Sequence, residues 1–101
     1  MLVAAAVATS AVETWTAGDD GLTQRFAEDL RLATAAMTGP PLRATIAQIE
    51  PTSGGKWITT VTFRRAGRDI YVARCTRKER DLPQCAQRAA AAAERLLRKV
   101  R

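Results

Sequence analysis

Basic side chains that can bind an anion are concentrated in the second half of the chain. Residues 56–101 hold 13 of the 16 Lys and Arg residues but only 4 of the 10 Asp and Glu residues, a formal charge of +9. Residues 1–55 hold 3 basic and 6 acidic residues, a formal charge of −3. Ammonium and guanidinium groups bind phosphates and carboxylates. A field with one positive end attracts polyanions, so the charge pattern predicts an anionic partner.

Seven of these cations form the candidate phosphate-binding set. One group precedes the last predicted helix, a second lies along the exposed side of that helix, and a single residue follows a Gly-Gly loop. A helix start adds unpaired N–H groups and positive potential, and glycines let the backbone approach a partner closely. The set is Lys56, Arg77, Lys78, Arg80, Arg88, Arg95 and Lys99, with Gly54 and Gly55 as loop contacts. The alternative interpretation is that these cations bind no partner and lie in a solvated connector and on the solvent-exposed face of a helix.

Residue types that catalyse reactions are sparse. The chain has no His, which removes the commonest general base and the commonest metal ligand. Its carboxylates form no recognisable pair, and the sequence has neither a glycine-rich phosphate loop nor a nucleophile–base set. Two cysteines are too few for a four-ligand zinc site. We therefore predict a non-enzymatic protein with no catalytic residue, no metal site and no cofactor.

The two cysteines flank the charged connector that precedes the last predicted helix. Cys75 and Cys85 allow two interpretations. In an oxidising compartment they form a disulfide that tethers the last strand to the last helix. In a reducing compartment they are small buried thiols. The sequence leaves both interpretations open.

The amino end is apolar and ambiguous. Residues 1–18 form an apolar N-terminal segment, whose core at residues 2–12 is too short to span a bilayer. This core resembles an export signal, although no Lys or Arg precedes it; the other interpretation is an extra helix or strand that covers the core. We predict a cytoplasmic protein, or a secreted or periplasmic one if residues 2–12 are a signal remnant. Trp15 could plug the core or dock a partner.

Residues 19–101 are long enough for one domain with a modest core. Apolar residues recur at helical spacing over residues 21–37, directly after an Asp that can cap the helix. Residues 42–50 look extended, although Ile46 and Ile49 fall on opposite faces unless a bulge intervenes. The sequence therefore predicts a helix followed by an irregular strand.

Two clearer strands follow and predict a hairpin. Residues 57–64 and 70–75 alternate apolar with polar side chains, and Ala66-Gly67 suits a two-residue turn. The predicted cross-strand pairs are Phe63–Ile70, Val61–Val72 and Arg64–Asp69. From Gln84 the apolar positions again follow helical spacing. The predicted fold class is α+β: a three-stranded antiparallel sheet packed by two helices on one face (α-β-β-β-α), preceded by the apolar N-terminal segment.

Over residues 21–100 this order of elements resembles the double-stranded-RNA-binding domain. The closest local match is the alanine-rich stretch AQRAAAAAERLL, where that family has its second helix. The resemblance implies phosphate contacts from the start of the second helix and groove contacts from the first strand loop. The residues so implied are Lys78, Arg80 and Arg88, with Gly54, Gly55 and Lys56. The Gly-Pro-x-His loop motif of the family is absent.

These observations predict a small binding module rather than an enzyme. The leading hypothesis is that the basic C-terminal half contacts nucleic-acid phosphates, in RNA or DNA, with little sequence preference. The alternative is a small phage-borne, secreted or periplasmic protein-interaction factor that binds an acidic protein partner. No membrane span is predicted, and the oligomeric state stays open.

Overall fold

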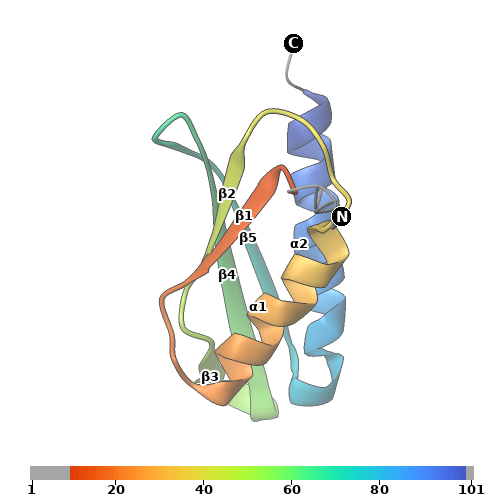
Figure 1. Ribbon diagram of the computed structural model, residues 1–101. Helices are drawn as coiled ribbons and strands as arrows, with labels where there is room; N and C mark the ends of the chain where they lie inside the picture. Colours follow the sequence, from red (N-terminus) through yellow and green to blue (C-terminus); the bar gives the residue numbers. More distant parts are fainter. Residues whose placement is uncertain (1–9, 100–101) are drawn as a thin grey trace, which may run out of the picture.

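The computed structural model describes residues 10–99, which form a mixed α+β fold with two helices and a five-stranded sheet (Figure 1). The strands are β1 (Val12–Thr16), β2 (Leu42–Ile46), β3 (Glu50–Thr52), β4 (Lys56–Arg65) and β5 (Arg68–Lys78). The helices are α1 (Gly21–Thr34) and α2 (Leu82–Arg98), with two short 3-10 helices, η1 (Ser53–Gly55) and η2 (Glu79–Asp81). Strand β4 is central: β5 pairs with one edge, and β2 and β3 share the other.

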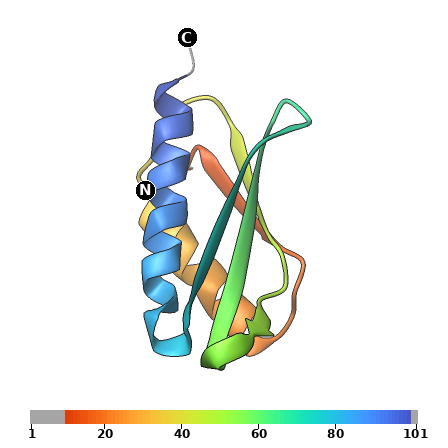
Figure 2. The same ribbon diagram turned by 180° about the vertical axis from the view of Figure 1, so that it is seen from behind.

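Both helices lie on one face of the sheet, and within residues 10–99 the opposite face carries no helix (Figures 1 and 2). Phe26 and Leu30 of α1 and the alanine-rich side of α2 are buried with Phe63 of β4 and Ile46 of β2. We call the helix-free side the outer face. No helix in the described part of the chain is long and apolar enough to cross a membrane.

The sheet is larger than the predicted three-stranded antiparallel sheet because β1 adds a parallel strand. Val12 lies opposite Leu42, and β1 runs parallel to β2 with α1 as the connection. Val12 is buried, but Thr14 and Thr16 follow it on the same face. Polar residues at these positions hide the alternation that identifies a strand. Residues 2–9, most of the predicted signal core, lie outside the described residues.

Helix α1 begins where an Asp N-cap was expected. The Asp20 carboxylate accepts hydrogen bonds from the backbone N–H of Thr23 at 3.0 Å and from its hydroxyl at 2.8 Å. These bonds favour the charged form and hold the pKa of Asp20 below its ordinary value. The helix ends at Thr34, earlier than the predicted residue 37, and the buried Thr34 hydroxyl donates to the carbonyl of Leu30.

The irregular strand predicted over residues 42–50 is two strands, β2 and β3. The chain leaves the ladder between them, and this break turns Ile49 toward the core. Ile46 and Ile49 are therefore both buried. The Ile49 N–H donates to the hydroxyl of Thr23 on α1, at 3.0 Å. One hydroxyl thus links the start of α1 to the break in the sheet.

The β4–β5 hairpin turns at Ala66 and Gly67, as predicted. Their φ angles are +52° and +81°, which suits a two-residue turn between twisted strands. The predicted Arg64–Asp69 pair is also present, with Arg64 Nε 3.0 Å from Asp69 Oδ1. Immediately after Asp69 the register shifts, and Ile70 has no partner on β4. The hairpin therefore contains a bulge next to its turn.

The bulge makes the predicted apolar register wrong. The observed pairs are Phe63–Tyr71 and Val61–Ala73, in place of Phe63–Ile70 and Val61–Val72. A slip of one residue moves every side chain of a strand to the other face. Ile70 and Val72 are therefore excluded from the core, and are 39% and 44% exposed. Tyr71 turns to the helix side but remains 43% exposed.

Helix α2 begins at Leu82, two residues before the predicted start, with Pro83 in its first turn. Pro suits this position because its missing N–H has no partner there. The buried side of α2 is mostly alanine, which lets the helix lie close to the sheet. A disulfide joins Cys75 of β5 to Cys85 of α2, and both residues are buried. Of the two interpretations of the cysteines, the structure therefore contains the disulfide that tethers the last strand to the last helix.

Candidate anion-binding surface

The first group of predicted cations lies at the end of the sheet where β4 begins and β5 ends. Lys56 lies directly opposite Lys78 on the β4–β5 ladder, and both project on the outer face. Arg77, opposite Trp57, projects on the helix side of the same end. Two ammonium groups on opposed residues of an antiparallel pair repel each other. Positive charge is therefore concentrated at this end of the sheet.

The glycine loop adjoins this end, as predicted. Gly54 and Gly55 form most of η1, which leads directly into Lys56. Their φ angles are +75° and +69°, a backbone that favours glycine. A Cβ at either position would meet nothing within 4 Å, so the loop surface is open. The loop is placed where a partner bound to Lys56 could also contact its backbone.

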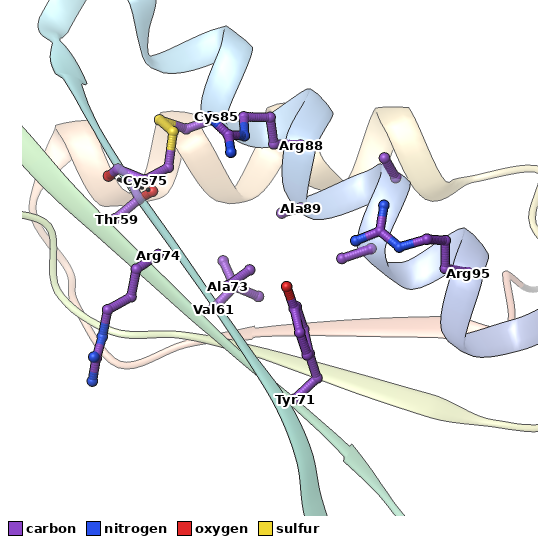
Figure 3. Close-up of a pocket in the computed structure, with 12 residues that line it drawn as sticks. Thr59, Val61, Tyr71, Ala73, Arg74, Cys75, Cys85, Arg88, Ala89 and Arg95 are labelled. Atoms are coloured by element: carbon purple, nitrogen blue, oxygen red, sulfur yellow. Dashed lines mark hydrogen bonds between the residues drawn. A yellow bond between two sulfur atoms is a disulfide. The ribbon is translucent and has the colours of Figure 1, made fainter.

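A second group borders a groove between β5 and α2. The groove has a volume of about 190 Å³ and a floor of small apolar side chains, including Ala73, Ala89 and the Cys75–Cys85 disulfide. Arg88 and Arg95 lie on its helix side (Figure 3). The Tyr71 hydroxyl rises from β5 toward the helix, while Arg74 points away from it along the open side of the strand.

The remaining two predicted cations lie apart from these groups. Lys99 is the C-cap of α2, at the opposite end of the helix from the disulfide. Arg80, in η2, borders a hollow between α1 and the start of α2 together with Arg25, Asp29 and Glu79. The seven predicted cations therefore do not share one surface: five lie along β5 or beside it, and two lie elsewhere.

Sequence reasoning missed one cation of this region, Arg74. It lies opposite Thr60 and projects on the outer face, on the same side of the sheet as Lys56 and Lys78. The sequence did contain a signal for this position, because side chains along a strand alternate between its two faces. Arg74 and Lys78 are four residues apart and therefore lie on the same face. We call six cations the β5 cation surface: those of the second half of β5, of the facing start of β4 and of the helix side of the groove, without Arg68 at the turn end. They are Lys56, Arg74, Arg77, Lys78, Arg88 and Arg95.

The cations of the β5 cation surface form no ion pair with a described carboxylate, and the same holds for Arg25, Arg65, Arg68, Arg80 and Lys99. Among the described side chains, four ion pairs form: Arg31–Glu28, Arg43–Glu13, Arg64–Asp69 and Arg98–Glu94. None of them includes a residue of the β5 cation surface. The Arg77 guanidinium donates to the carbonyl of its neighbour Thr76, at 2.8 Å. None of these six cations is therefore neutralised by direct contact with a described carboxylate.

The second half also contains a cation with a structural role. Arg65, at the end of β4, donates from Nη2 to the carbonyl of Leu96 at 2.8 Å. This bond satisfies a backbone acceptor near the C-terminal end of α2, where a positive charge also complements the helix dipole. Its Nε is buried without a partner among the described residues. Arg65 thus connects the sheet to α2 and is not counted in the β5 cation surface.

The arrangement suits reversible binding of an extended anion. Its cations are exposed or half-buried and spread over both sides of one strand. In the described part of the chain, no three His, Cys, Asp or Glu side chains are grouped so that they could hold a metal ion.

No protein-family model matches the sequence, and no curated protein matches it significantly.

Proposed function

We propose that this protein is a small non-enzymatic binding module that contacts nucleic-acid phosphates through the β5 cation surface. The observation that carries the proposal is the grouping of these six cations on and beside one strand, where none of them forms an ion pair with a described carboxylate. Guanidinium and ammonium groups bind phosphate oxygens through charge-assisted hydrogen bonds. Phosphate contacts do not depend on base identity, so sequence preference is weak.

The Lys56–Lys78 pair adds support. Like charges directly opposite each other on a ladder oppose folding, and opposite charges at such positions favour it. The protein uses the favourable arrangement at Arg64–Asp69 but not at Lys56–Lys78 or Arg65–Arg68. In the second like-charge pair, the Arg65 guanidinium donates to the carbonyl of Leu96. A bound phosphate between the two ammonium groups would relieve their repulsion. The resemblance to the double-stranded-RNA-binding domain, which implies contacts from Lys56, Lys78 and Arg88, remains a prediction.

A charge-matched pair of variants tests this function. The double variant Lys56→Gln/Lys78→Gln and the control Arg31→Gln/Arg98→Gln each remove two positive charges, but the control removes only ion-paired ones. Fluorescence anisotropy with labelled duplex RNA and DNA, from about 50 to 200 mM salt, gives affinity and its salt dependence. We expect the first variant to flatten the slope of log K against log salt by roughly 1.8, about 0.9 for each phosphate that the protein no longer neutralises.

The control should keep a slope close to that of the wild type, because its cations are already neutralised by Glu28 and Glu94. Equal slopes for the two variants would show that only net charge matters and that the β5 cation surface is not the site. Folded wild-type protein that binds neither duplex RNA, duplex DNA nor single strands at about 50 mM salt overturns the proposed function.

The edge of β5 favours a second candidate function, binding of an acidic protein segment. Within the described range β5 pairs only with β4, so one row of its backbone groups is open, and Ile70 and Val72 are exposed beside it. An added strand could pair with this edge and place acidic side chains near Arg88 and Arg95. The disulfide is compatible with both predicted locations, cytoplasmic and secreted or periplasmic. An NMR titration with an acidic peptide that leaves the β5 amides unshifted rejects this candidate.

A further inference from the structure

The outer face of the sheet is divided into rows of different chemistry. One row crosses four strands and reads Glu13, Arg43, Arg64 and Asp69. Its two cations are each paired with an acid, at 3.2 Å on β1 and 3.0 Å on β5. The row is therefore neutral as a whole.

The next row has no charged residue. It reads Trp15, Thr45, Thr62 and Val72 in ladder register across β1, β2, β4 and β5. Beyond it, toward the start of β4, lie Arg74 and then the Lys56–Lys78 pair. Between them, on the β3 side of β4, lies the exposed Glu50 opposite Ile58. The outer face thus changes from neutral to uncharged to mainly positive along the strands, within one continuous sheet.

Trp15, at the β1 end of this row, is unusually exposed for its residue type. Its side chain is 51% exposed, although a Trp normally buries most of its area. The Arg43 guanidinium lies 4.1 Å from the ring centroid, and Arg43 is in turn held by Glu13. One side of the indole is therefore supported by a fixed cation, while much of its surface remains free to stack.

We propose that the outer face binds single-stranded nucleic acid, with an unpaired base stacked on Trp15 and the following phosphates at Arg74, Lys56 and Lys78. The inference rests on the proposed function and adds to it the strandedness of the ligand and a stacking residue. Proteins that bind single strands combine an aromatic platform with cations that follow the backbone. Both parts occur here on one helix-free sheet face.

The dimensions are consistent with this path. Neighbouring strands are about 4.8 Å apart, so Trp15 on β1 and Arg74 on β5 are separated by roughly 14 Å across the sheet. The row between them contains Thr45 and Thr62, whose hydroxyls can donate to phosphate or base oxygens and present no negative charge. A base inside a duplex is already stacked on both sides, so stacking on Trp15 stabilises only the binding of an unpaired base.

A three-protein comparison tests the inference. The wild type, Trp15→Ala and the control Leu32→Ala are titrated by anisotropy with a labelled pyrimidine strand of about 12 nucleotides, and with the same strand annealed to its complement. Leu32 is 68% exposed on α1 and provides a matched loss of exposed apolar surface. We expect Trp15→Ala to lose at least about fivefold in affinity for the single strand, the smallest effect of losing one base–aromatic stack.

The salt dependence separates stacking from charge. Trp15→Ala removes no cation, so its slope of log K against log salt should equal that of the wild type. Arg74→Gln should instead flatten the slope by roughly 0.7, the value for one neutralised phosphate on a single strand. Leu32→Ala should match the wild type in both affinity and slope.

A second pair of variants keeps the test independent of Trp15. Thr62→Glu and Thr62→Gln introduce side chains of nearly the same shape at the middle of the uncharged row, and differ only in charge. We expect Thr62→Glu to weaken single-strand binding relative to Thr62→Gln, because a carboxylate would lie beside the phosphate path.

The outcomes are distinct. If wild-type protein binds nucleic acid but prefers the duplex, or if Trp15→Ala and Leu32→Ala bind equally well, the stacking inference is wrong and the proposed function stands. If Thr62→Glu binds as well as Thr62→Gln, the path across the outer face is wrong. If neither single strand nor duplex binds at about 50 mM salt, the inference and the proposed function both fail.

Discussion

The two ends of the β4–β5 hairpin differ in ion pairing and in exposed apolar surface, although each has a like-charge ladder pair, Lys56–Lys78 at the open end and Arg65–Arg68 at the turn end. At the open end, Lys56 and Lys78 face each other, neither forms an ion pair with a described carboxylate, and the disulfide ties β5 to α2. At the turn end, Arg64 is paired with Asp69. The turn end stands to the side of α2, away from both helices, in Figure 2, and β5 exposes a short apolar run there.

The difference shows which charges serve folding and which are available for binding. A cross-strand ion pair helps to fix the register of the turn end, where a bulge could otherwise allow slippage. At the open end the disulfide holds β5 to α2, so this end of the strand is anchored without a cross-strand ion pair. The predictions below test this division, from the largest expected effect to the smallest.

Removal of the disulfide should have the largest effect on stability. The double variant Cys75→Ala/Cys85→Ala frees the short connector between β5 and α2, whose cysteines are 10 residues apart. The chain-entropy model assigns such a loop about 3 kcal/mol, which for a domain of this size lowers Tm by more than about 10 °C. Thermal unfolding followed by circular dichroism measures the shift.

Reductant added to the wild type is the matched control, because it opens the same loop without changing a residue. We expect the two treatments to give similar Tm values. A double variant as stable as the oxidised wild type would show that the open end is secured by packing alone, and the contrast between the two ends would disappear.

Loss of the charge at the N-cap of α1 should lower stability less than loss of the disulfide. The Asp20 carboxylate lies outside the hairpin and already has hydrogen-bond partners, so it serves as a reference for the hairpin charges. Because the pKa of Asp20 is lowered in the folded protein, its ionised form stabilises the fold at neutral pH. That stability is lost as the pH falls below the ordinary value of 3.8 and through the folded pKa. Asp20→Asn keeps a capping side chain but cannot ionise.

Urea unfolding of the wild type and Asp20→Asn from neutral pH to about pH 2 measures this contribution. The free energy of unfolding of the wild type should fall more steeply than that of the variant in the acidic range. Identical curves would mean that the cap contributes no charge-dependent stability, and that Asp20 is no reference for the charges of the hairpin.

A charge reversal at the turn end should have a moderate effect. Asp69→Lys replaces an opposite-charge pair by a like-charge pair beside Arg64, and both side chains are well over a third exposed. Solvent screening limits the loss to about 0.5–1 kcal/mol. Asp69→Asn, which removes the charge without reversing it, should lose less. Urea unfolding of both variants gives the order, and equal losses would show that the pair contributes through its hydrogen bond alone.

The contrast between the ends also explains what could be predicted from the sequence. The two helices, the turn at Ala66-Gly67 and the Arg64–Asp69 pair follow from local periodicity and turn chemistry, and all are present. The strand β1 was missed because it is short and has polar residues on its core side. Local patterns are silent about pairing with a strand thirty residues away.

The errors in the candidate site come from the register of one strand. Alternation alone assigned Ile70 and Val72 to the core, whereas one bulged residue reverses the faces of β5. The same reversal decides that Arg74 accompanies Lys78 on the outer face. The position of Trp15 depends on β1 and was equally inaccessible. Charge content was thus predictable from composition, but its distribution over the surface required the sheet register.

The smallest stability effect should come from charge reversal at the open end, and its sign should be opposite to that at the turn end. Lys78→Glu gives Lys56 an opposite-charge partner across the ladder, so we expect a gain in the free energy of unfolding of about 0.5 kcal/mol or less. The same variant should bind nucleic acid more weakly, because it replaces a phosphate-binding ammonium group by a carboxylate. Lys78→Gln should lie between the wild type and Lys78→Glu in both stability and affinity.

Urea unfolding and anisotropy titrations on the same samples measure the two quantities. A variant that gains stability while it loses affinity shows that the Lys56–Lys78 repulsion is retained for binding; one that loses stability, or keeps its affinity, shows that it is not.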